Sequence, residues 1–288
     1  MVIETGRNMN VVLFMMLIGN FFVITHASTS EFNNVCNKLW SQDRNRISLG
    51  RHYQVNIQGR IYDASSNTDR AYAPLFSYVD RNVLNKPTFK AFIALLDNYD
   101  RFVGNTEDMT SSETRESWAF LHAISSTGPF RELHKYLVMK RKAPPSMNDF
   151  LQEMFKIWFY RYRRLSYRDS SGFEHVFLGE ISRGAVTGFH NWLQFYFLEK
   201  NKQLDYRGFM RYYNVEPSRL KLQLYWGRYK KLVTSMFLGT SPEFDIAVYT
   251  LCFLVNPGKS CSCTINGQNI PITTHPLGKY VGSAYLRI

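Results

Sequence analysis

The chain has 288 residues, enough for one large domain or two small ones. Hydrophobic residues make up 45% of it and aromatic residues 16%, and its charged residues are interleaved rather than blocked, which excludes a wholly disordered chain. The formal net charge of +12 favours an anionic partner such as RNA, a heparan-like polymer or an acidic lipid surface, and charge alone does not choose among these.

Residues 1–27 follow the order of a secretory signal peptide. Arg7 precedes an apolar run over residues 11–24, and small residues follow up to Ala27. The alternative is an uncleaved membrane anchor, but the run is short for the ~20 apolar residues that a span requires, and Asn20 interrupts it. We therefore expect cleavage near Ala27 and a secreted protein with no stable membrane anchor.

The predicted elements up to about residue 165 are helices. Apolar residues three and four positions apart occur at Leu39-Trp40 with Ile47, at Phe89–Leu96, at Trp118–Ile124 and over 147–164. Ser146 is the predicted cap of the last of these helices.

The second half mixes helices with strands. The alternation over 220–224 predicts a half-buried strand, and Ser241-Pro242-Glu243 predicts the start of a helix that continues through Leu251. Asn266-Gly267 predicts a hairpin turn, and 280–285 a final strand. A further helix is expected to open at Gly188. The predicted class is therefore α+β, with a helical amino-terminal half followed by a mixed sheet-and-helix half.

Four cysteines remain in the mature chain: Cys36, Cys252, Cys261 and Cys263. An oxidising destination favours one or two disulfides, and four cysteines allow three full pairings. Cys261 and Cys263 have no second pair of ligands nearby, so they do not indicate a zinc site.

Two basic clusters, Arg161–Arg164 and Arg228–Lys231, interleave aromatic rings with cations. This arrangement suits nucleic acid, because bases stack on rings while cations meet phosphates. A solvated basic helix face explains the same pattern equally well.

His175 and His190 are the histidines that could act on RNA. RNA carries its own nucleophile, the 2′-hydroxyl, so cleavage needs a base for the hydroxyl proton, an acid for the departing 5′-oxygen and a cation for the phosphate. Two imidazoles and a lysine ammonium can fill these roles near neutral pH. A pair of histidines can also be purely structural.

The surroundings of the two histidines suggest a division of roles. His190 is expected in the first turn of the helix after Gly188, where the helix dipole favours a neutral imidazole that can act as base. His175 lies between Glu174 and Glu180, whose negative charges favour the imidazolium and hence an acid. The reverse assignment stays open.

Four segments carry a resemblance to a known family. Residues 170–180 resemble the first signature of the EndoU (XendoU-like) poly(U)-specific endoribonucleases, and residues 188–196 resemble the second. The first segment reads Ser-Ser-Gly-Phe-Glu-His-Val-Phe-Leu-Gly-Glu. The block 226–250 is similar to a third signature, and 282–285 is similar to the family's closing Gly-Thr-Ala-Tyr-Pro. Ser283, Leu286 and Asp245 depart from the family pattern, but none of these changes removes an acid, base or cation.

The resemblance implies an EndoU-type domain with a helical part over 28–165 and a catalytic part over 166–288. It implies that His175 and His190 are the catalytic histidines and that Lys231 is the catalytic lysine. Lys230 is the neighbouring alternative, but Lys231 keeps the family's spacing to the residues that follow.

Five more residues enter through the resemblance: Glu174, Glu180, Ser235, Ser283 and Tyr285. The two acids would orient the histidines or help bind a divalent ion, with Mn²⁺ implied as an activator; a strand-end role explains Glu180 equally well. The two serines and Tyr285 would recognise uridine, because hydroxyls exchange hydrogen bonds with a pyrimidine edge and a tyrosine ring packs on sugar or base. Core packing is the alternative for Tyr285.

The expected function is a secreted, monomeric uridylate-selective endoribonuclease that acts on single-stranded RNA and leaves 2′,3′-cyclic phosphate ends. DNA lacks the 2′-hydroxyl and should not be cleaved. The alternative is a catalytically silent protein that binds RNA or another polyanion. A secreted protease is a third possibility, but no Ser/His/Asp or Cys/His context supports it.

Overall fold

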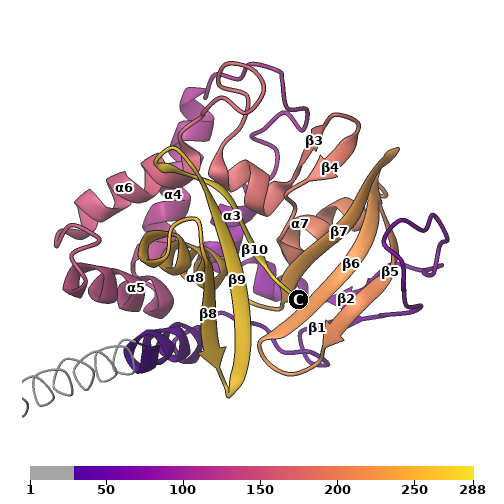
Figure 1. Cartoon of the computed structure of the whole chain (residues 1–288), viewed down its shortest axis with the longest axis horizontal. Coiled ribbons are helices and arrows are strands. Elements are labelled where there is room, and N and C mark those ends of the chain that lie inside the picture. Colours follow the sequence, from indigo (N-terminus) through magenta and orange to yellow (C-terminus); the bar gives the residue numbers. More distant parts are fainter. Residues whose placement is uncertain (1–28) are drawn as a thin grey trace, which may run out of the picture.

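Helices are the main regular elements in the amino-terminal half of the structure, a computed structural model that describes residues 29–288 (Figure 1). A first helix covers 29–41, and the others are α2 Arg81–Leu84, α3 Pro87–Ile93, α4 Ser111–Ser125, α5 Gly128–Met139 and α6 Met147–Phe159. The expected cleavage point near Ala27 lies outside the described residues. Within them, no helix has the length and apolar character needed to cross a membrane.

Local capping explains where these helices begin. Thr110 and Glu113 form a reciprocal capping box on α4, and the Ser146 hydroxyl accepts a hydrogen bond from the backbone N–H of Asp149 at the start of α6. The predicted cap at Ser146 is therefore confirmed. The predicted extent of α6 to residue 164 is wrong, because Tyr160 turns to extended backbone (ψ 128°) and ends the helix at Phe159.

Three other sequence predictions for this half need correction. Ile47 lies in a loop after the first helix, and Leu95-Leu96 lie in turns beyond the end of α3, although these leucine and isoleucine side chains are buried or half-buried as expected. The half also contains two short antiparallel strands, β1 Tyr53–Val55 and β2 Phe76–Val79. Strands this short carry too few alternating residues to be found from periodicity.

A five-stranded sheet forms the other side of the molecule, in the order β3-β4-β7-β6-β5 (Figure 1). Its strands are β3 Glu180–Ser182, β4 Ala185–Thr187, β5 Leu204–Tyr213, β6 Ser218–Trp226 and β7 Tyr229–Leu238. Only the β4–β7 pairing is parallel. The predicted strand over 220–224 is confirmed as β6, and helix α7, Trp192–Lys200, packs on this sheet.

A three-stranded sheet in the order β10-β9-β8 lies between the helices and the larger sheet (Figure 1). It consists of β8 Ser260–Ile265, β9 Gln268–Leu277 and β10 Tyr280–Leu286, and it packs on α8, Pro242–Val255. The predicted cap at Ser241 and the predicted strand at 280–285 are confirmed. So is the hairpin turn at Asn266-Gly267, where both residues have positive φ. The α+β class is therefore confirmed.

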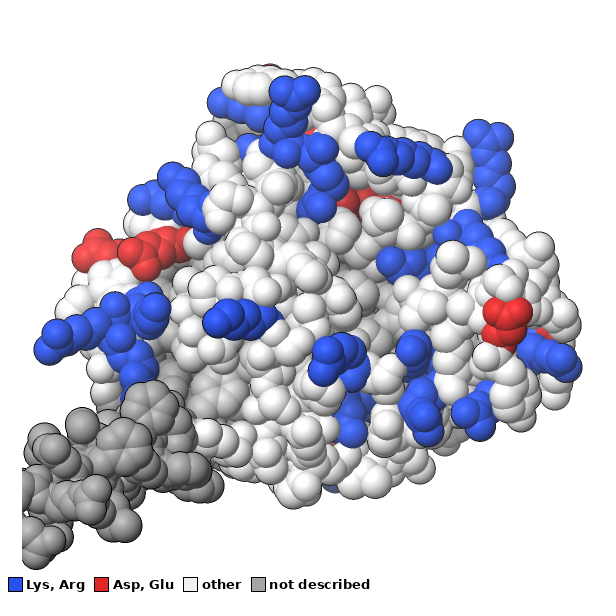
Figure 2. Space-filling model, viewed as in Figure 1, with Lys and Arg blue, Asp and Glu red and all other residues white. Residues whose placement is uncertain are grey.

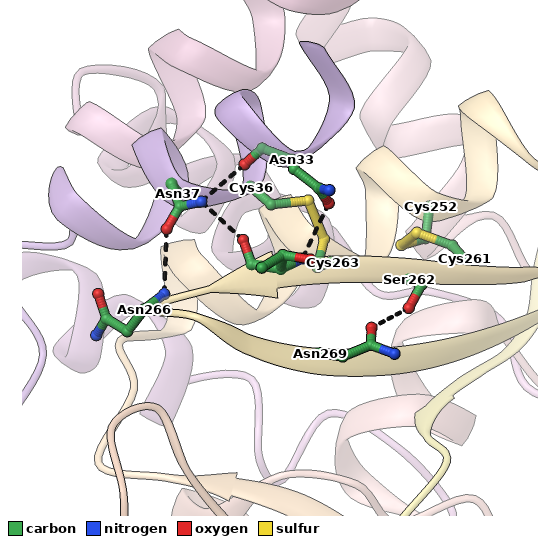
Figure 3. The surroundings of a disulfide bond; sticks show 10 residues. Asn33, Cys36, Asn37, Cys252, Cys261, Ser262, Cys263, Asn266 and Asn269 are labelled. Atoms are coloured by element: carbon green, nitrogen blue, oxygen red, sulfur yellow. Dashed lines mark hydrogen bonds between the residues drawn. A yellow bond between two sulfur atoms is a disulfide. The ribbon is translucent and has the colours of Figure 1, made fainter. Parts of the chain in front are cut away.

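Two disulfides join Cys36 to Cys263 and Cys252 to Cys261, so the described chain has no free cysteine (Figure 3). The first bond fastens the first helix to β8. Asn37 strengthens this contact, because its side chain donates to the Thr264 carbonyl at 2.8 Å and accepts from the Asn266 backbone at 3.1 Å. The first helix is thus tied to the carboxyl-terminal sheet although 227 residues separate the two cysteines in sequence.

Candidate active site

His175 lies in a single π-helical turn, η1, that covers Glu174–Leu178. Such turns widen a helix locally and occur often at functional sites. The turn ends at Gly179, whose positive φ of 81° lets the chain reverse into β3. His175 is 8% exposed and lines the pocket described below.

Gly188 brings the His190 segment against this turn. Its φ is +61°, and a Cβ atom at this position would lie 1.7 Å from the carbonyl oxygen of His175, so only glycine fits. The following residues are held by two backbone hydrogen bonds, from Phe189 N–H to His175 O (3.0 Å) and from His190 N–H to Val176 O (2.7 Å). The two histidines are therefore fixed side by side by backbone contacts.

His190 does not lie in the first turn of α7, as the sequence suggested. Asn191 caps that helix and His190 precedes the cap, so helical position does not set its protonation. Its Nδ1 donates to the carbonyl of Ser235 at 2.9 Å, with the Thr234 hydroxyl oxygen 3.2 Å away. Because Nδ1 carries the proton, Nε2 of the neutral ring keeps its lone pair.

Burial lowers the pKa of His190 well below its usual value, and the positive charge of Lys231 lowers it further. Burial also lowers the pKa of Lys231 to about 8. Near neutral pH, His190 is therefore a neutral base and Lys231 remains largely a cation.

A pocket of about 430 Å³ opens where β10 meets β7, and six of the eight sequence-predicted site residues line it. They are His175, His190, Lys231, Ser235, Ser283 and Tyr285. A larger pocket of about 610 Å³ lies elsewhere, between β2 and α7, and contains none of them.

The two predicted acidic residues differ in their relation to His175. Oε2 of Glu180 lies 2.5 Å from Nδ1 of His175, so this carboxylate orients the ring. Glu174 is buried away from the pocket and has Arg161 at 3.8 Å as its charged neighbour. Burial and the nearby charge of Glu180 raise the pKa of Glu174 well above its usual value.

The sequence-based expectation for His175 was that flanking carboxylates favour the imidazolium. Glu180 does raise the pKa of His175, but burial lowers it more, and the net pKa is below the usual value. The imidazolium is therefore less populated than the sequence suggested.

Three further predicted residues, Ser235, Tyr285 and Ser283, line the pocket. The Ser235 hydroxyl donates to the carbonyl of Leu286 at 2.6 Å, which leaves its oxygen free to accept. The Tyr285 ring stacks on the His190 ring with centroids 5.5 Å apart. Tyr285 is half-buried and lines the pocket, so it does not belong to the core. Ser283 lies on the same strand, two residues before Tyr285.

A sequence profile described as "Endoribonuclease XendoU" matches residues 31–286. The chain belongs to the XendoU endoribonuclease family. It is therefore an endoribonuclease, and the resemblance stated from the signature segments is confirmed.

Two relatives match the chain over nearly their whole length. The chain is 40% identical over 267 residues to uridylate-specific endoribonuclease B of Danio rerio, covering 88% of this chain and 95% of the relative. It is 41% identical over 270 residues to poly(U)-specific endoribonuclease-B of Xenopus laevis, covering 88% and 92%. The fold matches the solved structure titled "The structure of XendoU: a splicing independent snoRNA processing endoribonuclease" with a TM-score of 0.77 and 38% identity, over 90% of this chain and 97% of that one.

Sequence reasoning missed Arg164 in this XendoU-family site. Its guanidinium Nε lies 3.4 Å from Oε2 of Glu180, and a terminal nitrogen donates to the carbonyl of Gly282 at 2.8 Å. Arg164 therefore links the carboxylate behind His175 to the strand that carries Ser283. Its place in the basic cluster 161–164 had suggested nucleic-acid contact, but Arg161 and Arg164 pair with internal carboxylates instead.

Thr234 and Lys221 were also missed. Thr234 lies beside Nδ1 of His190, and Lys221 lines the pocket from the neighbouring strand. The alternation of β6 could have placed Lys221 on one face of the sheet, but nothing local identifies which face lines a pocket.

The donor atoms of this site do not fit a resident divalent ion. No aspartate or glutamate is among the described residues that line the pocket, and Glu180 is already bound by His175 and Arg164. The one close group of three metal-ligating residue types in the described chain is Cys252, Cys261 and Cys263, whose sulfurs are all in disulfides.

Proposed function

We propose that this endoribonuclease cleaves single-stranded RNA on the 3′ side of uridines by attack of the 2′-hydroxyl on the adjacent phosphorus. The observation that supports the proposal is the convergence of His175, His190 and Lys231 on one pocket, with each histidine held at Nδ1. Each ring thus keeps Nε2 for the substrate.

The proposed reaction begins at His190. Its neutral Nε2 takes the 2′-hydroxyl proton, and the 2′-oxygen forms a bond to phosphorus. The bond from phosphorus to the 5′-oxygen breaks, and Nε2–H of His175 protonates that leaving oxygen. The products are a 2′,3′-cyclic phosphate and a 5′-hydroxyl.

The other two charged groups act on this reaction without exchanging protons with the RNA. Lys231 stabilises the negative charge that builds on the non-bridging oxygens, and burial strengthens this effect because little water screens it. Glu180 accepts the Nδ1–H of His175 and so supports the protonated form that serves as acid.

Uridine selectivity is proposed to come from the hydrogen-bond direction at Ser235. Its hydrogen is directed to Leu286 O, so its oxygen acts as an acceptor toward the pocket. Uracil presents an N3–H donor, whereas the N3 atom of cytosine is an acceptor and would face another acceptor. Ser283 and Tyr285 complete the pocket around the nucleoside.

We also propose that the protein is secreted as a monomer after removal of residues 1–27. Two disulfides support an oxidising compartment. Terminal sequencing of protein from the medium of expressing eukaryotic cells tests this proposal, with an amino terminus near residue 28 expected. A protein that keeps residues 1–27, or stays inside the cell, would contradict it.

Mn²⁺ stays an expectation of the resemblance, and we assign no step of the reaction to it because the pocket lacks suitable ligands. Titration of Mn²⁺ into EDTA-treated protein checks this assignment. Measurable cleavage in EDTA is expected, and complete dependence on Mn²⁺ would overturn it.

The test of the proposed function compares four proteins on an oligoribonucleotide with one uridine among adenosines. Wild type is expected to cleave after the uridine. His190→Ala and Lys231→Ala are expected to lose at least ~100-fold in kcat. His122→Ala, a change at an exposed position on α4, is the matched control and should keep full activity. Inactive wild-type protein that still binds the RNA would favour a binding protein.

A further inference from the structure

Lys221 lines the pocket from β6, one strand farther across the large sheet than Ser235. In the register of the large sheet, Lys221 on β6 is directly opposite Ser235 on β7, and Arg211 on β5 is directly opposite Lys221. Directly paired residues of neighbouring antiparallel strands point to the same face of a sheet. Ser235, Lys221 and Arg211 therefore form a row that starts in the pocket and continues across the sheet.

Arg287 adds a third cation to this row. It follows β10 and lines the pocket together with Lys221. Lys221 is held at the pocket by a hydrogen bond from Nζ to the carbonyl of Ile288 at 2.9 Å. We call Arg211, Lys221 and Arg287 the basic row. Figure 2 shows basic side chains gathered over β5 and β6, beside the hollow between the two sheets.

The cations of the basic row have no acidic side chains as partners. Arg161, Arg164 and Arg207 all form ion pairs with carboxylates. Within the described residues, no member of the basic row has an aspartate or glutamate carboxylate within 4 Å, and Lys221 contacts only the backbone oxygen of Ile288. Arg211 and Arg287 are exposed, and Lys221 is half-buried. Cations in a row that no acidic side chain neutralises attract the phosphates of a nucleic-acid strand.

We propose that the basic row binds the phosphates on the 5′ side of the scissile uridine. This inference rests on the proposed function, which places the 3′-phosphate of that uridine at His175, His190 and Lys231 and its base at Ser235. The RNA strand then leaves the pocket past Ser235, in the direction of Lys221. Two strand spacings of about 4.8 Å each extend the row to about 10 Å across the sheet. Longer substrates would thus gain affinity from their upstream side.

A binding experiment separates this proposal from catalysis. The probes are two fluorescent oligonucleotides that contain a single 2′-deoxyuridine, which blocks cleavage, and four riboadenosines placed either upstream or downstream of it. The proteins are wild type, Lys221→Gln, Arg211→Gln and the control Lys135→Gln, which removes an exposed cation on α5, on the far side of the molecule. Fluorescence anisotropy gives Kd at several salt concentrations, and urea unfolding checks that each variant is folded.

For the upstream probe, Lys221→Gln and Arg211→Gln are each expected to raise Kd about tenfold at low salt and to reduce the slope of log K against log salt by about one. For the downstream probe, the expected change is twofold or less, and Lys135→Gln should match wild type on both. Equal losses on the two probes, or a loss confined to the downstream probe, would overturn the proposal. Failure of wild type to cleave the all-ribose version would contradict the proposed function but leave this binding result interpretable.

Discussion

The carboxylate of Glu180 lies 2.5 Å from Nδ1 of His175. Glu180 is the first residue of β3, and His175 lies in the π-helical turn just before that strand. This contact is the main force that opposes the effect of burial on His175, because burial lowers the pKa of the ring while Glu180 raises it. The acid of the proposed reaction therefore depends on a carboxylate that never touches the RNA.

The first prediction concerns Glu180→Gln. Loss of the negative charge lowers the pKa of His175 further, so the alkaline limb of the kcat/KM profile should move to lower pH. The rate at pH 7 should then fall about tenfold for every pH unit by which the limb moves. Wild type should itself lose activity as pH rises from below ~6.5, because the pKa of His175 is already below its usual value.

The control for this prediction is Glu174→Gln. Burial and the charge of Glu180 keep the Glu174 carboxyl protonated to higher pH, and its ion-pair partner is Arg161 rather than a histidine, so the alkaline limb should stay where it is in wild type. If the alkaline limb moves equally in both variants, overall charge, and not the Glu180 contact, controls the pKa of His175.

The second prediction concerns Ser235→Ala. The variant lacks the hydroxyl oxygen that we propose accepts from uracil N3–H, while the backbone carbonyl that holds His190 remains. The ratio of kcat/KM for uridine over cytidine substrates should fall by about tenfold, the value of one hydrogen bond of ~1.4 kcal/mol. Paired substrates that differ only at the scissile nucleoside give this ratio. An unchanged ratio with a lower rate on both would assign selectivity elsewhere.

The third prediction concerns the two disulfides. The Cys36–Cys263 bond closes a loop of 227 residues, and the Cys252–Cys261 bond closes one of nine. Since a longer loop loses more entropy when it closes, replacing Cys36 and Cys263 by alanine should lower the free energy of unfolding by ~2–5 kcal/mol, and replacing the other pair should cost less. Urea titrations of both double variants measure these losses. The opposite order would mean that local packing, not chain entropy, dominates.

The fourth prediction concerns pH and the buried carboxyl of Asp43. Burial, with the nearby Glu243, raises its pKa to about 7 in the folded protein, whereas in the unfolded chain it is near 3.9. Between these values the folded state holds more protons than the unfolded state. The contribution of Asp43 to stability is therefore fully present below pH ~4 and is lost as pH rises toward 7, by up to ~1.4 kcal/mol per pH unit.

Asp43→Asn cannot ionise, so its free energy of unfolding should change less steeply between pH 4 and 7 than that of wild type. Urea unfolding at three pH values in this range provides the comparison. Asp245 is also buried with a raised pKa. It should therefore give both proteins some dependence of the free energy of unfolding on pH. If the free energy of unfolding changes equally with pH in the two proteins, Asp43 is not protonated in the folded state as we infer.

Much of the fold could be predicted because local signals are strong at particular residues. Ser146, Ser241 and Asn266-Gly267 mark a helix start, a second helix start and a hairpin, and all three act as their sequence context indicates. The end of α6 could not be predicted, because Tyr160 leaves the helix through its contacts in three dimensions, including a stack on Tyr280 with centroids 4.8 Å apart.

The pocket was predictable only through signature segments. Six of the predicted site residues line it, yet their environments could not be predicted, since burial is a property of the folded chain. His190 owes its low pKa to burial and to Lys231 rather than to a helix dipole, and Arg164 turned inward to Glu180 although its sequence context resembled a nucleic-acid surface. Long-range contacts of this kind leave no periodic signal in the sequence.

The most direct test of the central claim removes one oxygen atom from the substrate. An oligoribonucleotide with a single uridine is compared with the same molecule in which that uridine is 2′-deoxyuridine, and the products are resolved by mass spectrometry. The account predicts cleavage of the first to a 2′,3′-cyclic phosphate and a 5′-hydroxyl, and no cleavage of the second. Cleavage of the deoxyuridine substrate, or a 5′-phosphate product, would show that the RNA does not supply the nucleophile and would contradict the account.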